Sequence, residues 1–124
     1  MTFRVERLDH VELFVRDLEA AVSWYRRVLG LEEIRRWDPH PVMIGRGGTM
    51  LALFRDRGDE EPRAPALGNF RRVAWLTDGA GFEAAQSHLK ELGVAFDGPI
   101  DHDGPRSIYF VDPDGHPLEI TTYP

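Results

Sequence analysis

The pattern of apolar and polar residues predicts a strand and then an amphipathic helix near the start of the chain. In LDHVELFV (8–15) the side chains alternate in character, as in a strand with one buried face, and Asp17 is a suitable helix N-cap. The next segment, LEAAVSWYRRVLG (18–30), repeats apolar residues at helical spacing and ends at Gly30, which is typical of a left-handed C-cap. Trp24 and Tyr25 are neighbours on this helix, and they are not both expected at the centre of its buried side. Three short strands are then expected, at 32–37, 42–44 and 50–54.

The same order of elements recurs in the second half of the chain. RRVAWLTD (71–78) is predicted as a strand, and GFEAAQSHLKELG (81–93) as a helix whose inward residues are Phe82, Ala85, Leu89 and Leu92. Strands are expected again at 94–96, 107–111 and 118–122, with the turn DPDG at 112–115. Between the halves, RDRGDEEPRAPALGN (55–69) is charged and rich in Pro and Gly, which predicts a linker.

Aligning the halves indicates an internal duplication. The alignment places His10 of the first strand on Arg72 of the second half, and Ala52 on Glu119. Each half is then a β-α-β-β-β unit, in which one helix covers one face of a sheet and leaves the other face free. If the two free faces join, these four positions meet in a cavity. The alternative is that side chains of the chain itself fill this cavity.

The predicted fold class is therefore α+β, with two β-α-β-β-β modules whose curled mixed sheets form a cavity. A chain of 124 residues is the size of one domain, and we expect a single domain over 1–124. Module 1 is expected at about 5–54, the linker at 55–69 and module 2 at about 70–123.

Composition removes several classes of function. The net charge of −6 argues against a nucleic-acid surface, and no apolar run approaches the length of a membrane span. The charged start MTFRVERLDH lacks the apolar core of a signal peptide, so we expect a cytoplasmic protein. Because the chain has no cysteine, any metal must be held by histidine, carboxylate or water.

Two segments of the chain resemble a known family. LDHVELFVRDLEAAVSWYRRVLGLE (8–32) and IYFVDPDGHPLEI (108–120), with the paired units between them, are similar to the vicinal oxygen chelate (VOC) superfamily. That superfamily includes glyoxalase I, extradiol ring-cleaving dioxygenases, fosfomycin-resistance enzymes and bleomycin-resistance proteins. The resemblance spans essentially the whole chain and implies the fold described above. It does not select a reaction, because the scaffold serves several reactions and some non-enzymatic binders.

The resemblance also implies metal ligands from the first and last strands of each unit. His10 and Glu119 match two of these positions, and Arg72 and Ala52 occupy the other two. A catalytic divalent site usually has three protein ligands and a water, so this set is incomplete. A guanidinium group at a ligand position would repel the cation and is expected to pair bidentately with Glu119. Either no cofactor is needed and Arg72 holds an anion, or a divalent ion (Zn, Ni, Co, Fe or Mn) binds with a substitute ligand.

Further residues are candidates for the lining of the cavity. Glu12 and Phe14 share the face of His10, and the hydroxyl group of Tyr109 offers a polar contact to a ligand. Tryptophan on a strand can stack on an aromatic ligand or pack in the core. We expect Glu119 and Tyr109 to be catalytic in an enzyme, and the predicted ligand-binding residues are Arg72, Glu12, Phe14, Trp37 and Trp75.

Two functions remain open from the sequence. The first is a binder of a small anionic or aromatic molecule, in which Arg72 holds the anionic group. The second is a divalent-metal-dependent lyase, isomerase or dioxygenase of the glyoxalase type that uses His10 and Glu119. In both cases the expected partners are a small-molecule ligand and, as the resemblance implies, a second copy of the chain in a homodimer. The cavity then forms within one chain or across the dimer.

Overall fold

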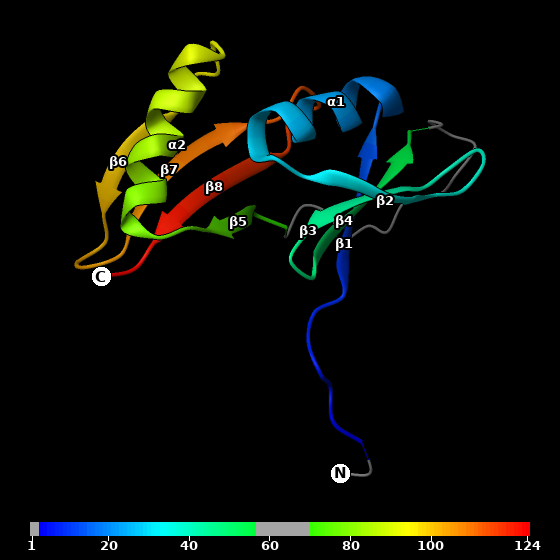
Figure 1. Cartoon of the computed structure of the whole chain (residues 1–124), viewed down its shortest axis with the longest axis horizontal. Coiled ribbons are helices and arrows are strands. Elements are labelled where there is room, and N and C mark those ends of the chain that lie inside the picture. Colours follow the sequence, from blue (N-terminus) through cyan, green and yellow to red (C-terminus); the bar gives the residue numbers. More distant parts are fainter. Residues whose placement is uncertain (1–2, 57–69) are drawn as a thin grey trace. The chain divides into compact units, whose positions relative to one another are not determined.

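The computed structural model describes residues 3–56 and 70–124, and it divides the chain into two compact units, 1–60 and 61–124. We call them unit 1 and unit 2. Each has its own sheet and helix (Figure 1). Of the predicted linker at 55–69, positions 57–69 lie outside the described residues. Neither helix in the described part of the chain is long and apolar enough to cross a membrane.

Unit 1 contains one helix and a four-stranded sheet. Its elements are β1 (His10–Val15), α1 (Leu18–Leu29), β2 (Glu32–Arg36), β3 (Val42–Arg46) and β4 (Thr49–Arg55). The strand order is β1-β4-β3-β2, in which β1 and β4 are parallel and the other pairs are antiparallel. The sheet is therefore mixed, as predicted.

The ends of α1 follow the sequence signals. The side chain of Asp17 accepts a hydrogen bond from the amide of Ala20 at 3.0 Å, and Gly30 adopts φ 70° at the C-terminal end. Trp24 and Tyr25 of this helix are both buried, with ring centroids 5.0 Å apart in an edge-to-face arrangement. The buried face of this helix is wide enough to hold adjacent aromatic residues, because one ring packs its edge against the other.

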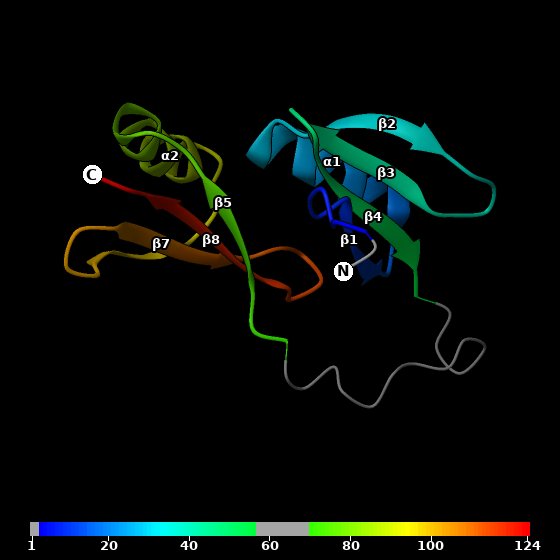
Figure 2. The same ribbon diagram turned by 90° about the horizontal axis from the view of Figure 1, so that it is seen from below.

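Unit 2 repeats the order of unit 1. Its elements are β5 (Val73–Leu76), α2 (Gly79–Glu91), β6 (Asp97–Asp101), β7 (Arg106–Val111) and β8 (Pro117–Thr122). The strand order is β5-β8-β7-β6, with β5 and β8 parallel (Figure 2). The predicted α+β class and the two β-α-β-β-β modules are confirmed.

The strand register agrees with the alignment of the halves. Val11 pairs with Leu51 in unit 1, and Val73 pairs with Leu118 in unit 2. The residue before Val11 is His10, and the residue before Val73 is Arg72. These two residues therefore occupy the same position in their sheets.

The predicted strand at 94–96 is wrong, because this stretch closes the end of α2. The amide of Val94 bonds to the carbonyl of Leu89 at 2.9 Å, and Gly93 adopts φ 71°. Strand β6 begins only at Asp97. Leu92, expected inward, is exposed because it is the C-cap residue, whereas Phe82 and Leu89 are buried as predicted.

The turn between β7 and β8 is built around a buried carboxylate. The backbone amides of Asp114 and His116 donate to Oδ1 of Asp112, each at 2.9 Å, and Nδ1 of His116 lies 2.7 Å from Oδ2. The side chain of Asp112 is 0% exposed and that of His116 is 24% exposed. The hydrogen bond to Asp112 raises the pKa of His116 above its usual value. This turn fixes where β8 begins and thus which face each of its side chains occupies.

We expect the contribution of His116 to stability to depend on pH. Because the pKa of His116 is raised in the folded state, its bond to Asp112 stabilises fully below the unfolded value of about 6.5, and the stabilisation is lost as pH rises through the folded pKa. His116→Gln should therefore lower the free energy of unfolding by about 1 kcal/mol at mildly acidic pH and by less under alkaline conditions. Urea denaturation over this pH range measures the difference.

The control for this prediction is a double-mutant cycle with Asp112→Asn. The asparagine retains a carbonyl oxygen for the two backbone amides but removes the charge that faces His116. In that background the effect of His116→Gln should no longer vary with pH. An effect of His116→Gln that grows with rising pH would contradict the assigned role of the pair.

Candidate functional site

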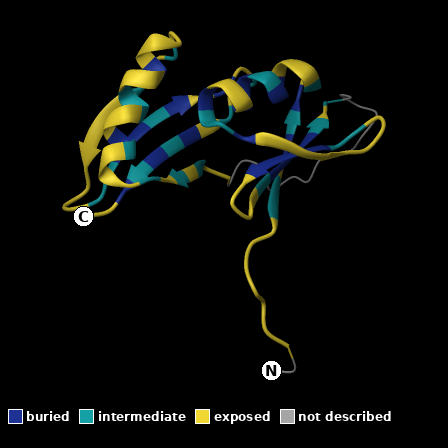
Figure 3. Ribbon diagram, in the orientation of Figure 1, coloured by how far each residue is buried: buried dark blue, intermediate teal, exposed yellow. Residues whose placement is uncertain are grey.

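A pocket of about 600 Å³ lies on one face of the sheet of unit 2. Along β8, Leu118 and Ile120 are buried on the face that α2 covers, and Glu119 between them points to the other face. Figure 3 shows buried and half-buried positions alternating along β8. The pocket is on this second face, which we call the open face, and its lining residues are Arg71, Arg72, Asp97, Ile100, His102, Tyr109 and Glu119.

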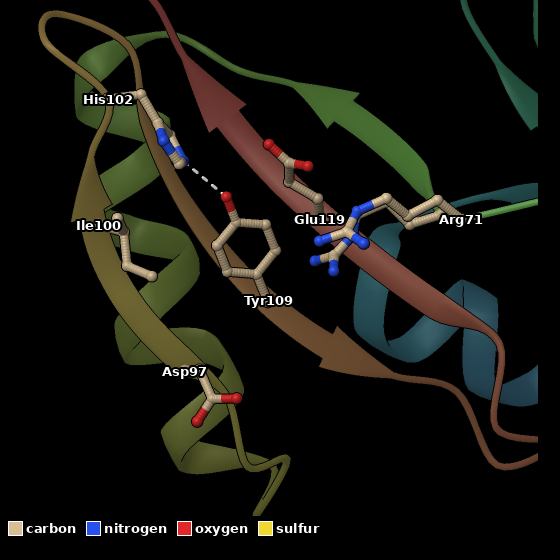
Figure 4. Close-up of a pocket in the computed structure, with 7 residues that line it drawn as sticks. Arg71, Asp97, Ile100, His102, Tyr109 and Glu119 are labelled. Carbon is tan, nitrogen blue, oxygen red and sulfur yellow. Dashed lines mark hydrogen bonds between the residues drawn. The ribbon is translucent and has the colours of Figure 1, made fainter.

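Strand register places three of these side chains in one row across the open face. Asp97 of β6 pairs with Tyr109 of β7, and Tyr109 pairs with Glu119 of β8. Paired residues of neighbouring strands share a face. The phenol ring of Tyr109 therefore has a carboxylate on each side (Figure 4).

Glu119 is held by a hydroxyl group that the sequence analysis did not identify. The hydroxyl of Ser107 donates to Oε2 of Glu119 at 2.7 Å, and Ser107 is fully buried. Oγ of Ser107 also lies 3.0 Å from Oγ1 of Thr121, which donates to the carbonyl of Arg106 at 3.1 Å. Oε1 of Glu119 has no hydrogen-bond partner among the described residues. The alternation of β7 and β8 was the available signal, because it puts Ser107, Thr121 and Glu119 on one face.

Arg72 does not form the expected ion pair with Glu119. Its guanidinium carbon lies 4.4 Å from the centre of the Tyr109 ring, and its Nε is buried without a hydrogen-bond partner in the described part of the chain. The expectation of bidentate pairing is wrong because Ser107 holds the carboxylate while the ring of Tyr109 holds the guanidinium group. Arg71, which precedes β5, points toward Glu119 and Tyr109 (Figure 4).

His102 is the second residue that the sequence analysis left without a role. Its Nε2 is hydrogen-bonded to the hydroxyl of Tyr109 at 2.6 Å (Figure 4). The residue follows β6 in an exposed loop, where the amide of His102 bonds to the carbonyl of Pro105 at 2.7 Å. Only the folded loop brings it over Tyr109, so spacing in the sequence gave no signal.

His10 lies in unit 1 with both ring nitrogens bonded to carboxylates. Nδ1 lies 2.7 Å from Oδ2 of Asp9, and Nε2 lies 3.0 Å from Oε2 of Glu12. The hydrogen bond to Asp9, followed by that to Glu12, raises the pKa of His10. His10, Glu12 and Phe14 share one face of β1, as expected. Because His10 belongs to unit 1 and Glu119 to unit 2, their pairing stays a prediction.

Neither candidate tryptophan is among the residues that line the pocket of unit 2. Trp37 follows β2 in unit 1, where the guanidinium carbon of Arg35 lies 4.4 Å from the centre of its ring. Trp75 pairs with Ile120, so it lies on the face of the sheet opposite Glu119. The structure therefore does not bring Trp75 together with Glu119.

The donor set of unit 2 does not fit a divalent cation. The positions that the family resemblance assigns to ligands hold Arg72 and Glu119, and a guanidinium group cannot donate an electron pair to a metal. Over residues 3–56 and 70–124, no group of three or more histidine, aspartate or glutamate side chains could hold a metal ion. The pocket instead offers positive charges, negative charges and an aromatic ring.

A protein-family model and several known proteins match nearly the whole chain. Residues 7–120 match the model of the Glyoxalase/Bleomycin resistance protein/Dioxygenase superfamily. The chain is 28% identical to Glutathione transferase FosA of Serratia marcescens over 116 residues, which cover 94% of this chain and 80% of that protein. It is 28% identical over 120 residues to Metallothiol transferase FosB of Staphylococcus haemolyticus, covering 95% of this chain and 84% of that protein. The structure of Virulence protein STM3117 from Salmonella typhimurium has the same fold, with a TM-score of 0.79 at 24% identity over 98% of this chain and 100% of that chain.

We predict that Ser107→Ala destabilises unit 2, whereas Thr122→Val does not. Ser107→Ala removes a buried hydroxyl that bonds to a carboxylate, which should cost about 1–3 kcal/mol of unfolding free energy. The matched control, Thr122, is also buried, but its hydroxyl oxygen has no partner among the described residues. Thr122→Val should be neutral or stabilising. Chemical denaturation measures both, and equal losses would contradict the assigned role of Ser107.

Proposed function

The chain belongs to the Glyoxalase/Bleomycin resistance protein/Dioxygenase superfamily, and from this premise we propose that it binds a small molecule with an anionic group in the pocket of unit 2. One observation carries the proposal. Arg71 and Arg72 both line this pocket, and neither forms an ion pair with a carboxylate among the described residues. Two guanidinium groups that form no ion pair with a described residue favour an anion.

The environment of Arg72 supports this role. A guanidinium group keeps its charge at any physiological pH and presents its N–H donors in a fork that matches a carboxylate or phosphate group. Its buried Nε lacks a partner in the described part of the chain, and a buried unpaired donor is costly. The ring of Tyr109 below the guanidinium group adds about 0.5–1 kcal/mol and holds it in place. An anion that accepts from Arg72 would supply the missing partner.

The remaining lining residues suggest the other part of the ligand. Ile100 is an exposed apolar side chain within the pocket, and it lies beside the aromatic ring of Tyr109 in the lining. An apolar or aromatic group on the ligand would cover this surface. If the ligand is a substrate, Glu119 and Tyr109 are the residues that would face it with an acid–base group. The proposed contacts from Glu12, Phe14 and Trp37 of unit 1 stay predictions, whereas Trp75 lies on the other face of the unit 2 sheet and is not proposed as a contact of this pocket.

We also propose that binding does not use the complete family set of metal ligands. The replacement of two ligand positions by Arg72 and Ala52 supports this. The alternative is a divalent-metal-dependent lyase, isomerase or dioxygenase of the glyoxalase type that uses His10 and Glu119. The similarity to a protein named a metallothiol transferase favours that alternative. Assembly as a homodimer and a cytoplasmic location also stay predictions.

The anion site predicts that Arg72→Gln weakens the binding of phenylacetate. A ligand of this size is expected to bind with a millimolar dissociation constant, and loss of one charge-assisted contact should raise that constant about tenfold. Titration followed by amide chemical shifts measures it. The matched control is Arg46→Gln, because Arg46 is an exposed arginine of β3 in unit 1. Equal affinities in the two variants, or no saturable binding to the wild type, would contradict the proposed function.

The metal question has its own experiment. After purification with Zn²⁺, Ni²⁺, Co²⁺, Fe²⁺ or Mn²⁺ offered and then removed by dialysis, we expect elemental analysis to find far less than one equivalent of metal. The reason is the incomplete ligand set. Stoichiometric metal in the wild type that is lost in both His10→Ala and Glu119→Gln would establish the metal-dependent alternative.

A further inference from the structure

We infer that the ligand of this pocket is a zwitterion, in which a protonated amine stands next to the anionic group. The inference rests on the proposed function and adds the chemical class of the ligand. It arises from the charges of the lining: Arg71 and Arg72 are positive, and Asp97 and Glu119 are negative. A ligand with only a negative charge would contact the two arginines and leave the two carboxylates without a partner of opposite charge.

The four charged side chains of the lining are not paired with one another. Neither arginine forms an ion pair with Asp97 or Glu119 in the described part of the chain. Opposite charges in one pocket usually neutralise each other, and two of these side chains are held by other contacts. Tyr109 holds the guanidinium group of Arg72, and Ser107 holds Oε2 of Glu119. Both signs of charge therefore stay available to a ligand.

The two carboxylates of the lining oppose a simple anion. An anion that approaches the two guanidinium groups also approaches the carboxylate of Glu119, which is next to Tyr109 in the strand register. Repulsion by like charge then offsets part of the attraction. A protonated amine on the ligand reverses the sign of this contribution, because Oε1 of Glu119 has no partner among the described residues and can accept its hydrogen bond.

The groups of opposite charge meet at Tyr109, where a ligand that carries an amine beside an anionic group is able to reach both. Glu119 and Tyr109 pair across adjacent strands, which lie about 4.8 Å apart. The guanidinium group of Arg72 lies over the ring of Tyr109, which is the partner of Glu119 in the strand register. The hydroxyl of Tyr109 is bonded to His102, which leaves Ile100 and the ring as an apolar surface. An amino acid with an apolar or aromatic side chain matches this arrangement.

Matched probes with one phenyl ring test the inference: phenylglycine, phenylacetate and benzylamine. These carry both charges, the negative charge alone and the positive charge alone. Chemical-shift titration of the wild-type protein should show phenylglycine binding about tenfold more tightly than either of the others. In Glu119→Gln this advantage over phenylacetate should disappear. The variant is conservative, because the glutamine carbonyl still accepts from Ser107.

Glu91→Gln is the control variant, since Glu91 is an exposed carboxylate at the end of α2 outside the pocket lining. It should retain the full preference for phenylglycine. Mandelate, which replaces the amine with a hydroxyl group, should bind no more tightly than phenylacetate. Mandelate as tight as phenylglycine would overturn the requirement for an amine.

The outcomes separate this inference from the proposed function. If phenylacetate binds as tightly as phenylglycine and Arg72→Gln weakens both, the anion site stands and the zwitterion is wrong. If Arg72→Gln weakens neither, the proposed function fails and the inference fails with it. If Glu119→Gln and Glu91→Gln retain the same preference for phenylglycine, Glu119 is not the acceptor, and the inference is overturned.

Discussion

Helix α2 covers only one face of its sheet, and the position of every pocket residue depends on this. Phe82 and Leu89 of the helix are buried, as are Leu118 and Ile120 of β8. Shifting β8 by one residue would expose Leu118 and Ile120 and bury Glu119 instead. Because burial of an apolar side chain contributes about 1.5–3 kcal/mol, such a shift is strongly unfavourable. The hydrogen bond from the amide of His116 to Asp112 fixes the residue at which β8 begins. The burial of alternate positions along β8 then directs Glu119 to the open face.

The periodicity of apolar residues was sufficient to predict the order of the elements and their repetition. Strand alternation placed Glu119 on the face opposite Leu118 and Ile120, and the alignment of the two halves placed Arg72 at the position of His10. Apolar periodicity failed where a contact partner decides the outcome. The stretch 94–96 closes α2 through hydrogen bonds rather than forming a strand, and Ser107 holds the carboxylate that Arg72 was expected to hold. Such choices between partners depend on three-dimensional distances.

The register of the two sheets shows that each unit has one carboxylate at the same pair of positions, but on a different strand. In unit 1, Glu12 of the first strand pairs with Ala52 of the last strand. In unit 2, Ala74 of the first strand pairs with Glu119 of the last strand. Each sheet thus retains one carboxylate and one alanine at this pair of positions, with the strands interchanged. An alignment that compares only the last strands reports a missing acid in unit 1, although the acid is present on the neighbouring strand.

The two carboxylates differ in their partners, and this difference supports the proposal of a ligand site in unit 2. In unit 1, Glu12 bonds to the imidazole of His10 at 3.0 Å, so acid and base satisfy each other. In unit 2 the residue at the position of His10 is Arg72, which lies over Tyr109 and forms no such bond to Glu119. Unit charges 4 Å apart interact by about 4 kcal/mol at an effective dielectric constant of 20. In unit 2, Arg72 and Glu119 do not form an interaction of this size with each other. A ligand with matching charges is able to form one with each of them.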